Sequence, residues 1–202
     1  MSRPEFNVEG STVAVCEALA SWLKPLIEGG PRDIHKVQIV ERHIGRFDTP
    51  EEITRYLSGR DGGVRITALK VREIKEQFGV TSGTVDLVAY VFTTESFGYS
   101  RDTRAEVICG QIARALTVYE SGAADIKGAL DAPEQVQMDN LYSADIDKKG
   151  IAIWAVTWQQ RWSLEEPLPD AMLDDFLRLH LEQHLVDGAP INTADINMRE
   201  TP

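Results

Sequence analysis

Residues 150–162 read GIAIWAVTWQQRW, and this stretch decides the fold. Side chains of an extended chain alternate between two faces, so Trp154, Trp158 and Trp162 fall on the same face. The opposite face begins apolar at Ile153 and becomes polar toward Arg161. Aromatic residues on a sheet face beside a helix are normally buried. The stretch therefore predicts a strand whose tryptophans belong to the core, with stacking of bases or sugars as the less favoured interpretation.

The residues before this strand predict the rest of a sheet. Residues 147–150 read DKKG, a hairpin turn in which Gly150 can take a positive φ. A strand over about residues 135–146 precedes that turn. Two further strands are predicted over residues 64–74 and 80–95. The second of these is apolar on both faces, which indicates a central strand with cover on each side.

Helical periodicity indicates the elements that cover the sheet. Capping boxes at Thr49 and Thr103 predict where two of the helices begin. A short strand over about residues 36–41 precedes the first of these boxes. The predicted helices cover residues 11–28, a brief segment from residue 49 to about residue 58, residues 103–119 and residues 170–186.

This order of elements indicates an α+β fold, with a mainly antiparallel sheet and helices packed mostly on one face. We expect residues 1–188 to form a single domain. Residues 189–202 are polar and have no core of their own, so we expect a tail that is disordered or an arm that pairs with a neighbour.

The length and composition are those of a protein that can bury a hydrophobic core without the help of disulfides or metal. The chain has 202 residues, and 43% of them are hydrophobic. Cys16 and Cys109 lie in predicted amphipathic helices and suit small core positions in a reducing compartment. No secretory signal and no apolar run of about 20 residues is present, so we expect a protein that stays in the cytoplasm of the cell that makes it, with no membrane partner.

The formal net charge is -11, which favours repulsion of a phosphate backbone over binding to it. The charge has two interpretations. It can serve solubility alone, which is the simpler explanation, or it can line a passage through which DNA moves without adhering.

No motif in the sequence indicates catalysis, a cofactor or a metal. The glycine-rich residues 58–63, SGRDGG, lack the ending of a phosphate-binding loop and favour a plain turn. His180 and His184 have a two-ligand spacing on a predicted helix, but a third zinc ligand is missing and a solvated helix face is favoured. We therefore assign no catalytic, cofactor-binding or metal-binding residue, and we do not expect an enzyme.

The segment from Thr103 to Leu164 resembles a family of tail proteins of Mu-like long-tailed phages, related in fold to tail terminators. The resemblance lies in a capped helix, a loop, a strand, a Lys/Gly turn and the strand Gly-Ile-Ala-Ile-Trp-Ala-Val-Thr-Trp. The strands over residues 64–92 and the amphipathic N-terminal helix extend it to about residues 11–185.

The resemblance implies a virion protein of the phage tail, assembled in the cytoplasm of a bacterial host. Tail terminators form a ring, usually a hexamer, that caps the tail tube and stops its growth. They hold the last sheath ring in contractile tails and present a surface to the head connector or neck proteins. DNA passes through the lumen of the ring. The family contributes no catalytic residue.

Charged residues before the third helix are candidates for a subunit interface. Arg101, Asp102 and Arg104 cluster there and suit ion pairing between subunits, although a solvated helix start is the favoured interpretation. Arg161, at the polar end of the tryptophan strand, joins them as a candidate.

Three other functions stay open at this point. One is another neck or tail-completion protein, and a second is an adaptor that binds a single partner. The third is a small-molecule binding protein or enzyme that uses the crevice between the helices and the sheet.

Overall fold

The computed structural model describes residues 6–44, 53–55, 61–77, 79–118, 122–165, 178–184 and 190–197. Contacts between Cα atoms divide the chain into two compact units, Met1–Glu165 and Glu166–Pro202. The division falls earlier than the boundary expected at residue 188.

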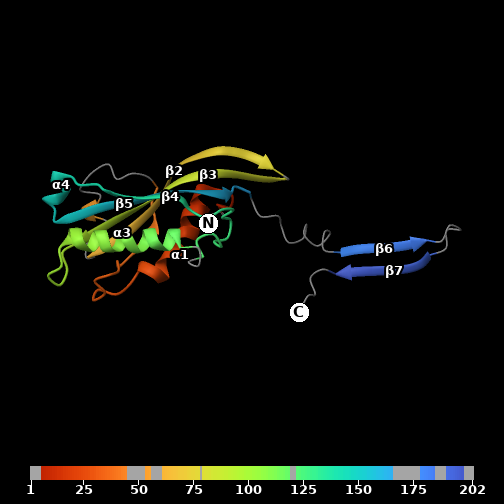
Figure 1. Cartoon of the computed structure of the whole chain (residues 1–202), viewed down its shortest axis with the longest axis horizontal. Helices are drawn as coiled ribbons and strands as arrows, with labels where there is room; N and C mark the ends of the chain where they lie inside the picture. The colour runs from red at the N-terminus through yellow and green to blue at the C-terminus, as the bar shows by residue number, and fades with distance from the viewer. Residues whose placement is uncertain are drawn as a thin grey trace, which may run out of the picture. The chain divides into compact units, whose positions relative to one another are not determined.

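The first unit is built on a five-stranded mixed sheet with the order β1-β2-β3-β5-β4 (Figure 1). Strand β1 pairs with β2 in parallel, and every other neighbouring pair in this sheet is antiparallel. The predicted α+β class with a mainly antiparallel sheet is confirmed. The elements are α1 (Thr12–Ile27), β1 (Val40–Arg42), β2 (Gly62–Gln77), β3 (Val80–Thr94), α3 (Arg101–Thr117), β4 (Glu134–Asn140), α4 (Ala144–Asp147) and β5 (Ile151–Ser163).

Strand β3 occupies the centre of this sheet, as its apolar residues on both faces predict. It pairs with β5 from Ser82–Ser163 to Thr94–Ile151. This register sets Leu87 opposite Trp158 and Val91 opposite Trp154, so these residues share one face of the sheet.

Helices α1 and α3 both pack on that face and contact each other, and Figure 1 shows α3 beneath the strands. Trp158 and Trp162 are 2% and 1% exposed, which confirms the prediction that they are core residues. Leu19 and Leu23 of α1 are fully buried in the same cluster. The helix-facing side of the sheet is therefore a filled apolar core, not a crevice.

The start of α3 corrects the predicted capping box at Thr103. The helix begins two residues earlier, at Arg101, and Ser100 is its N-cap. The backbone amide of Thr103 donates to the hydroxyl of Ser100 at 3.2 Å. Thr103 occupies the third helical position, where its own amide needs a cap, so it cannot be the cap itself.

Three predicted strand positions also shift. The strand expected over residues 135–146 ends at Asn140, and the single turn of α4 follows it before the turn at Gly150, whose φ is 73° as predicted. The strand expected over residues 36–41 is β1, and Val37 forms only an isolated parallel bridge with Glu28. Gly62, expected in a turn, begins β2. The capping box at residues 49–52 lies outside the described residues, while residues 53–55 are helical.

Strands β2 and β3 continue beyond the sheet as a two-stranded ribbon, visible in Figure 1 as the projecting yellow hairpin. The β5 partner of β3 ends at the pair Ser82–Ser163, whereas β2 and β3 stay paired to Gln77–Val80. Val80 at the end of this ribbon is 39% exposed. The ribbon therefore offers apolar as well as charged surface to solvent.

The second unit contains an antiparallel hairpin formed by β6 (Arg178–His184) and β7 (Pro190–Asn197). The helix predicted over residues 170–186 is wrong over residues 178–184. Leu179 and Leu181 are two residues apart, which is the strand period, and a short apolar run does not distinguish helix from strand. The segment predicted as an unpaired tail supplies the pairing strand β7, and this long-range partner decides the conformation.

Candidate functional site

The face of the sheet opposite α1 and α3 carries an apolar hollow of about 610 Å³. Alternation along β3 directs Val88, Tyr90 and Phe92 to this face, while β5 contributes Ile153 and Ala155. We call this feature the open-face hollow. Its lining residues are Ile53, Leu69, Val88, Tyr90, Phe92, Asp139, Asn140, Leu141, Ile146, Ile153, Ala155 and Thr157.

The floor of the open-face hollow is buried, but its rim is open to solvent. Phe92 is fully buried in a small cluster with Ile53, Ile151 and Ile153. Leu69 of β2 and Leu141 beyond β4 are 41% and 39% exposed. The cover expected on both sides of β3 is thus complete on the helix face and partial on the open face.

The described lining of the open-face hollow is mostly apolar. Asp139 is the single carboxylate among its lining residues. Its other polar groups are the Asn140 amide, the Thr157 hydroxyl and the Tyr90 phenol. A concave apolar surface with a few polar groups at one side is typical of a binding site.

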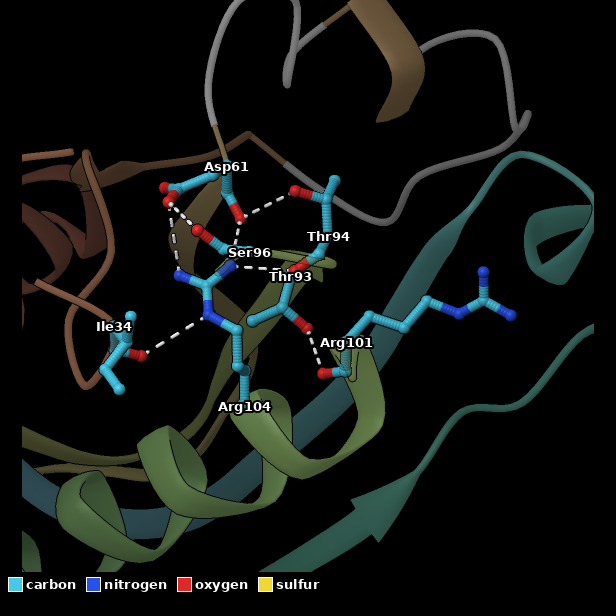
Figure 2. Close-up of polar contacts among 7 residues, drawn as sticks. All are labelled: Ile34, Asp61, Thr93, Thr94, Ser96, Arg101 and Arg104. Carbon is cyan, nitrogen blue, oxygen red and sulfur yellow. Dashed lines mark hydrogen bonds and ion pairs between the residues drawn. The ribbon is translucent and has the colours of Figure 1, made fainter. Parts of the chain in front are cut away.

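Arg104 is the centre of a polar cluster beside the first turn of α3 (Figure 2). The residue is 3% exposed, and its guanidinium donates to the Asp61 carbonyl at 2.9 Å and the Thr94 carbonyl at 2.7 Å. Its Nε donates to the Ile34 carbonyl at 3.3 Å, and the Asp61 carboxylate lies at 3.4 Å. The Ser96 hydroxyl also donates to that carboxylate, at 3.2 Å.

These contacts give Arg104 a role inside one subunit. The guanidinium ties helix α3 to the loop at Ile34 and to the residues that begin β2 and end β3. A buried charge needs such partners, because removal from water without them is costly. Burial leaves this guanidinium poorly placed for the ion pair between subunits that the sequence suggested.

Arg101 and Asp102 lie nearer the surface in the same helical turn. Arg101 pairs with Asp147 of α4, and its Nε is 3.9 Å from Asp102. The carbonyl of Arg101 accepts from the Thr93 hydroxyl at 2.7 Å, as Figure 2 shows. The Asp102 side chain is 58% exposed. An interface role for these two residues stays a prediction.

Arg161 lies away from that cluster, at the base of the projecting ribbon. Its guanidinium donates to the Ser82 hydroxyl at 2.8 Å and to the Gln77 amide oxygen at 3.4 Å. The residue therefore braces the ribbon against β5, and its interface role also stays a prediction. The sequence analysis grouped these four residues by their charge alone. It missed Asp61, which lies inside the glycine-rich stretch at residues 58–63 and gave no separate signal.

The cysteines are buried and are not placed as nucleophiles. Cys16 and Cys109 are 2% and 0% exposed, as their predicted core positions require. Burial raises the pKa of the Cys16 thiol to about 11 and that of Cys109 to about 12. Both thiols are thus protonated at neutral pH, and the thiolate is the reactive form.

Metal binding finds no support in the part of the chain that the structure describes. No group of three His, Cys, Asp or Glu residues there could hold a metal ion. His180 and His184 lie on strand β6, where four residues span about 13 Å, so the helical spacing behind the two-ligand interpretation is lost. Among the described helices, none has the length and apolar content that crossing a bilayer requires.

Comparison of the chain with models of known protein families and with curated proteins found no match.

Proposed function

We propose that the protein is a self-associating structural component of a phage tail, of the tail-terminator kind. In this role, copies form a ring, hexameric in the family that the sequence resembles, that caps the tail tube and stops its growth. The ring then joins the tail to the head connector. Its partners are other copies of the chain, the tail tube protein, the sheath protein of a contractile tail and neck proteins.

The observation that carries the proposal is the open-face hollow with its exposed rim. Leu69 and Leu141 at this rim are 41% and 39% exposed, and apolar side chains exposed together suit a contact with another protein. Here the exposed rim lies on the sheet, and Val80 at the end of the projecting ribbon is exposed as well. In an assembled ring, these exposed apolar surfaces would be buried between subunits.

The charge of the chain supports the same role. A net charge of -11 keeps unassembled copies soluble in spite of their apolar surface. In a ring, the same charge sign would keep DNA from adhering to the lumen, because like charges repel.

Electron microscopy of negatively stained protein tests the proposal directly. The protein is imaged alone and after mixing with tail tube protein from the same phage. We expect rings, or caps at the ends of tubes, and shorter tubes when the protein is present during their assembly. Single particles in both samples, together with unchanged tube lengths, would contradict the proposal.

A second candidate function is the binding of an apolar small molecule. The volume of the open-face hollow, about 610 Å³, lies within the ordinary range for ligand pockets. The site differs from the helix–sheet crevice that the sequence suggested, because it lies on the opposite face. A thermal-shift screen of fatty acids and aromatic compounds tests this function, and we expect a raised Tm that the Leu69→Asp variant loses. The absence of a shift with every compound would dismiss the candidate.

A further inference from the structure

Strand β4 forms one edge of the five-stranded sheet, and within the described residues β5 is its one strand neighbour. The amide of Leu141 donates to the carbonyl of Ile153 at 3.0 Å. Backbone groups alternate in direction along a strand, so those of Asp139 also point toward β5. The amides and carbonyls of Met138 and Asn140 point the other way, and both residues are exposed. Strand β4 therefore presents backbone donors and acceptors to solvent.

The opposite edge of the sheet, β1, differs because side chains of the same chain bind its backbone. The Val40 amide donates to the Glu28 carboxylate at 2.7 Å. The Arg42 carbonyl accepts from the Arg65 guanidinium at 3.1 Å. Among the described residues, no hydrogen bond of this kind reaches the outward-facing groups of β4. Of the two edges, β4 is thus the one that can accept a further strand.

A β-bulge limits this open edge to the second half of β4. The pairing with β5 shifts register between Glu134 and Gln137, and Gln135 inside the shift has a φ of 51°. A bulge disrupts the ladder at its position and protects an edge from pairing. The register is regular from Gln137 to Asn140 and continues into the Leu141 hydrogen bond. An added strand therefore pairs with residues 137–141.

The charge of β4 favours a basic partner. Its charged residues are Glu134 and Asp139, and it contains no Lys or Arg. Asp139 is exposed beside the open-face hollow and has no ion pair within the described part of the chain. Two copies of β4 paired with each other would bring four carboxylates to one contact, and like charges on neighbouring strands are destabilising. Charge complementarity thus selects a basic segment over a second copy of β4.

We propose that the edge of β4 binds an extended, basic segment of a partner protein, which adds to the sheet as an antiparallel strand along residues 137–141. In this mode of recognition, main-chain hydrogen bonds supply the affinity and alternate side chains supply the specificity. The antiparallel direction is chosen because its pairing is slightly more stable per residue. The inference goes beyond the proposed function, since it names a surface for an unlike partner and does not require a ring.

The alternation of the strand fixes the side chains that the segment carries. A Lys or Arg opposite Asp139 forms the ion pair that this carboxylate lacks. The residue two positions earlier lies opposite Leu141, which is 39% exposed at the rim of the open-face hollow, and an apolar side chain suits it. The residue opposite Met138, which is 37% exposed on the other face, is apolar as well. The segment therefore reads apolar, polar, basic, apolar.

A synthetic peptide with this pattern tests the inference. The probe is Ser-Ile-Thr-Lys-Val-Thr-Ser with blocked ends and a fluorophore, titrated with the full-length protein and followed by fluorescence anisotropy. We expect saturable binding, with the Lys of the peptide opposite Asp139. A peptide with Glu in place of Lys should bind at least about fivefold more weakly. The Asp139→Lys variant should reverse the preference between the two peptides.

N-methylated peptides separate strand addition from a general attraction between a basic peptide and an acidic protein. The amide of the peptide's Val points toward Met138, so a methyl group on it removes a hydrogen bond and blocks close approach. The amide of the peptide's Lys points away from β4, and a methyl group there leaves the contact intact. We expect about tenfold weaker binding for the first peptide and less than about a threefold change for the second.

Met138→Pro is the matching change in the protein. Proline removes the outward-facing amide, and an edge strand tolerates proline where that amide faces solvent. Met138→Val keeps the amide and is the control. We expect Met138→Pro to weaken peptide binding about tenfold and Met138→Val to leave it nearly unchanged, with similar Tm values for both variants. If Met138→Pro does not fold, the two N-methylated peptides decide the question.

Three results would overturn the inference. One is the absence of saturable binding of the Lys peptide, and another is equal binding of the two N-methylated peptides. The third is a mass, measured by light scattering, that falls in the Met138→Pro variant, because this would place a second copy on the edge of β4. Rings and capped tubes in the microscope depend on none of these results, so a failure here leaves the proposed function standing.

Discussion

At the scale of single residues, Arg104 is the charge on which the fold most depends. Replacement by alanine removes a donor from the carbonyls of Ile34 and Thr94 and removes the ion-pair partner of the Asp61 carboxylate, while the Asp61 carbonyl still accepts from the Thr94 amide and hydroxyl. Each unsatisfied buried group costs about 1–3 kcal/mol, so we expect Arg104→Ala to lower the free energy of unfolding by about 3 kcal/mol or more. Urea unfolding followed by circular dichroism measures this loss.

The control for Arg104 lies on the same helix. Arg114 is exposed, so Arg114→Ala should change the free energy of unfolding by less than about 0.5 kcal/mol. Arg104→Lys keeps the charge but replaces the planar guanidinium, which donates from three nitrogens, with a compact ammonium whose donors share one nitrogen, and we expect an intermediate loss. Equal stability of the Arg104→Ala and Arg114→Ala variants would refute the structural role of this cluster.

The two buried thiols make stability depend on alkaline pH. Their pKa values are raised from 9.0 to about 11 for Cys16 and about 12 for Cys109. The unfolded state therefore loses its thiol protons first, and stability that is fully present below pH 9 declines as pH rises toward 11. Within that window, each thiol lowers the free energy of unfolding by about 1.4 kcal/mol for each unit by which the pH rises.

The variant with Cys16→Ala and Cys109→Ala isolates this effect from other groups that titrate at high pH. Urea unfolding of both proteins at several pH values between 8 and 11 gives the comparison. We expect the alkaline decline to be shallower in the variant. Parallel curves for the two proteins would mean that the thiols ionise freely in the folded state.

At the scale of elements, the cap of α3 decides where that helix begins. Ser100 accepts from the Thr103 amide, and loss of an N-cap hydroxyl costs about 1 kcal/mol. We expect Ser100→Ala to lower the free energy of unfolding by about that amount. Thr103→Ala removes a side-chain contact on the exposed surface and should cost less. The same urea measurement decides between them, and a larger cost for Thr103→Ala would restore the capping box that the sequence suggested.

The sequence predicted elements best where a local pattern agrees with long-range packing. Burial in the sheet is the one environment that suits the tryptophan face of β5 and the two apolar faces of β3. Their alternation was therefore sufficient to predict both strands. The segment around Leu179 and Leu181 fits both a helix and a strand, and its conformation depends on pairing with β7. Local periodicity cannot supply a partner that lies later in the chain.

The candidate site was less predictable for the same physical reason. The open-face hollow combines residues from Ile53 to Thr157, and which face of the sheet stays open depends on where α1 and α3 pack. The acceptors of Arg104 come from residues 34, 61 and 94, which are far apart in the sequence. The sequence identified a charged cluster at the start of α3, but it could not tell a buried internal tie from a surface interface.

At the scale of the whole molecule, the two units should contribute separately to stability and to assembly. Both apolar clusters of the core lie between Val15 and Trp162, inside the unit Met1–Glu165. Glu165 and Leu164 remain tied to Thr81, since the Thr81 amide donates to the Glu165 carboxylate at 2.6 Å and the Leu164 amide donates to the Thr81 carbonyl at 2.9 Å. A chain ending at Glu165 therefore keeps its core and its last strand contacts.

We expect the chain that ends at Glu165 to unfold cooperatively, with a Tm within a few degrees of the full chain, because its core is unchanged. Differential scanning calorimetry measures the Tm, and light scattering after size exclusion measures the mass. The open-face hollow, which carries the proposed self-association, lies in the unit Met1–Glu165, so we also expect the truncated chain to associate as the full chain does. A truncated chain that is monomeric under conditions in which the full chain associates would place the subunit contact in residues 166–202.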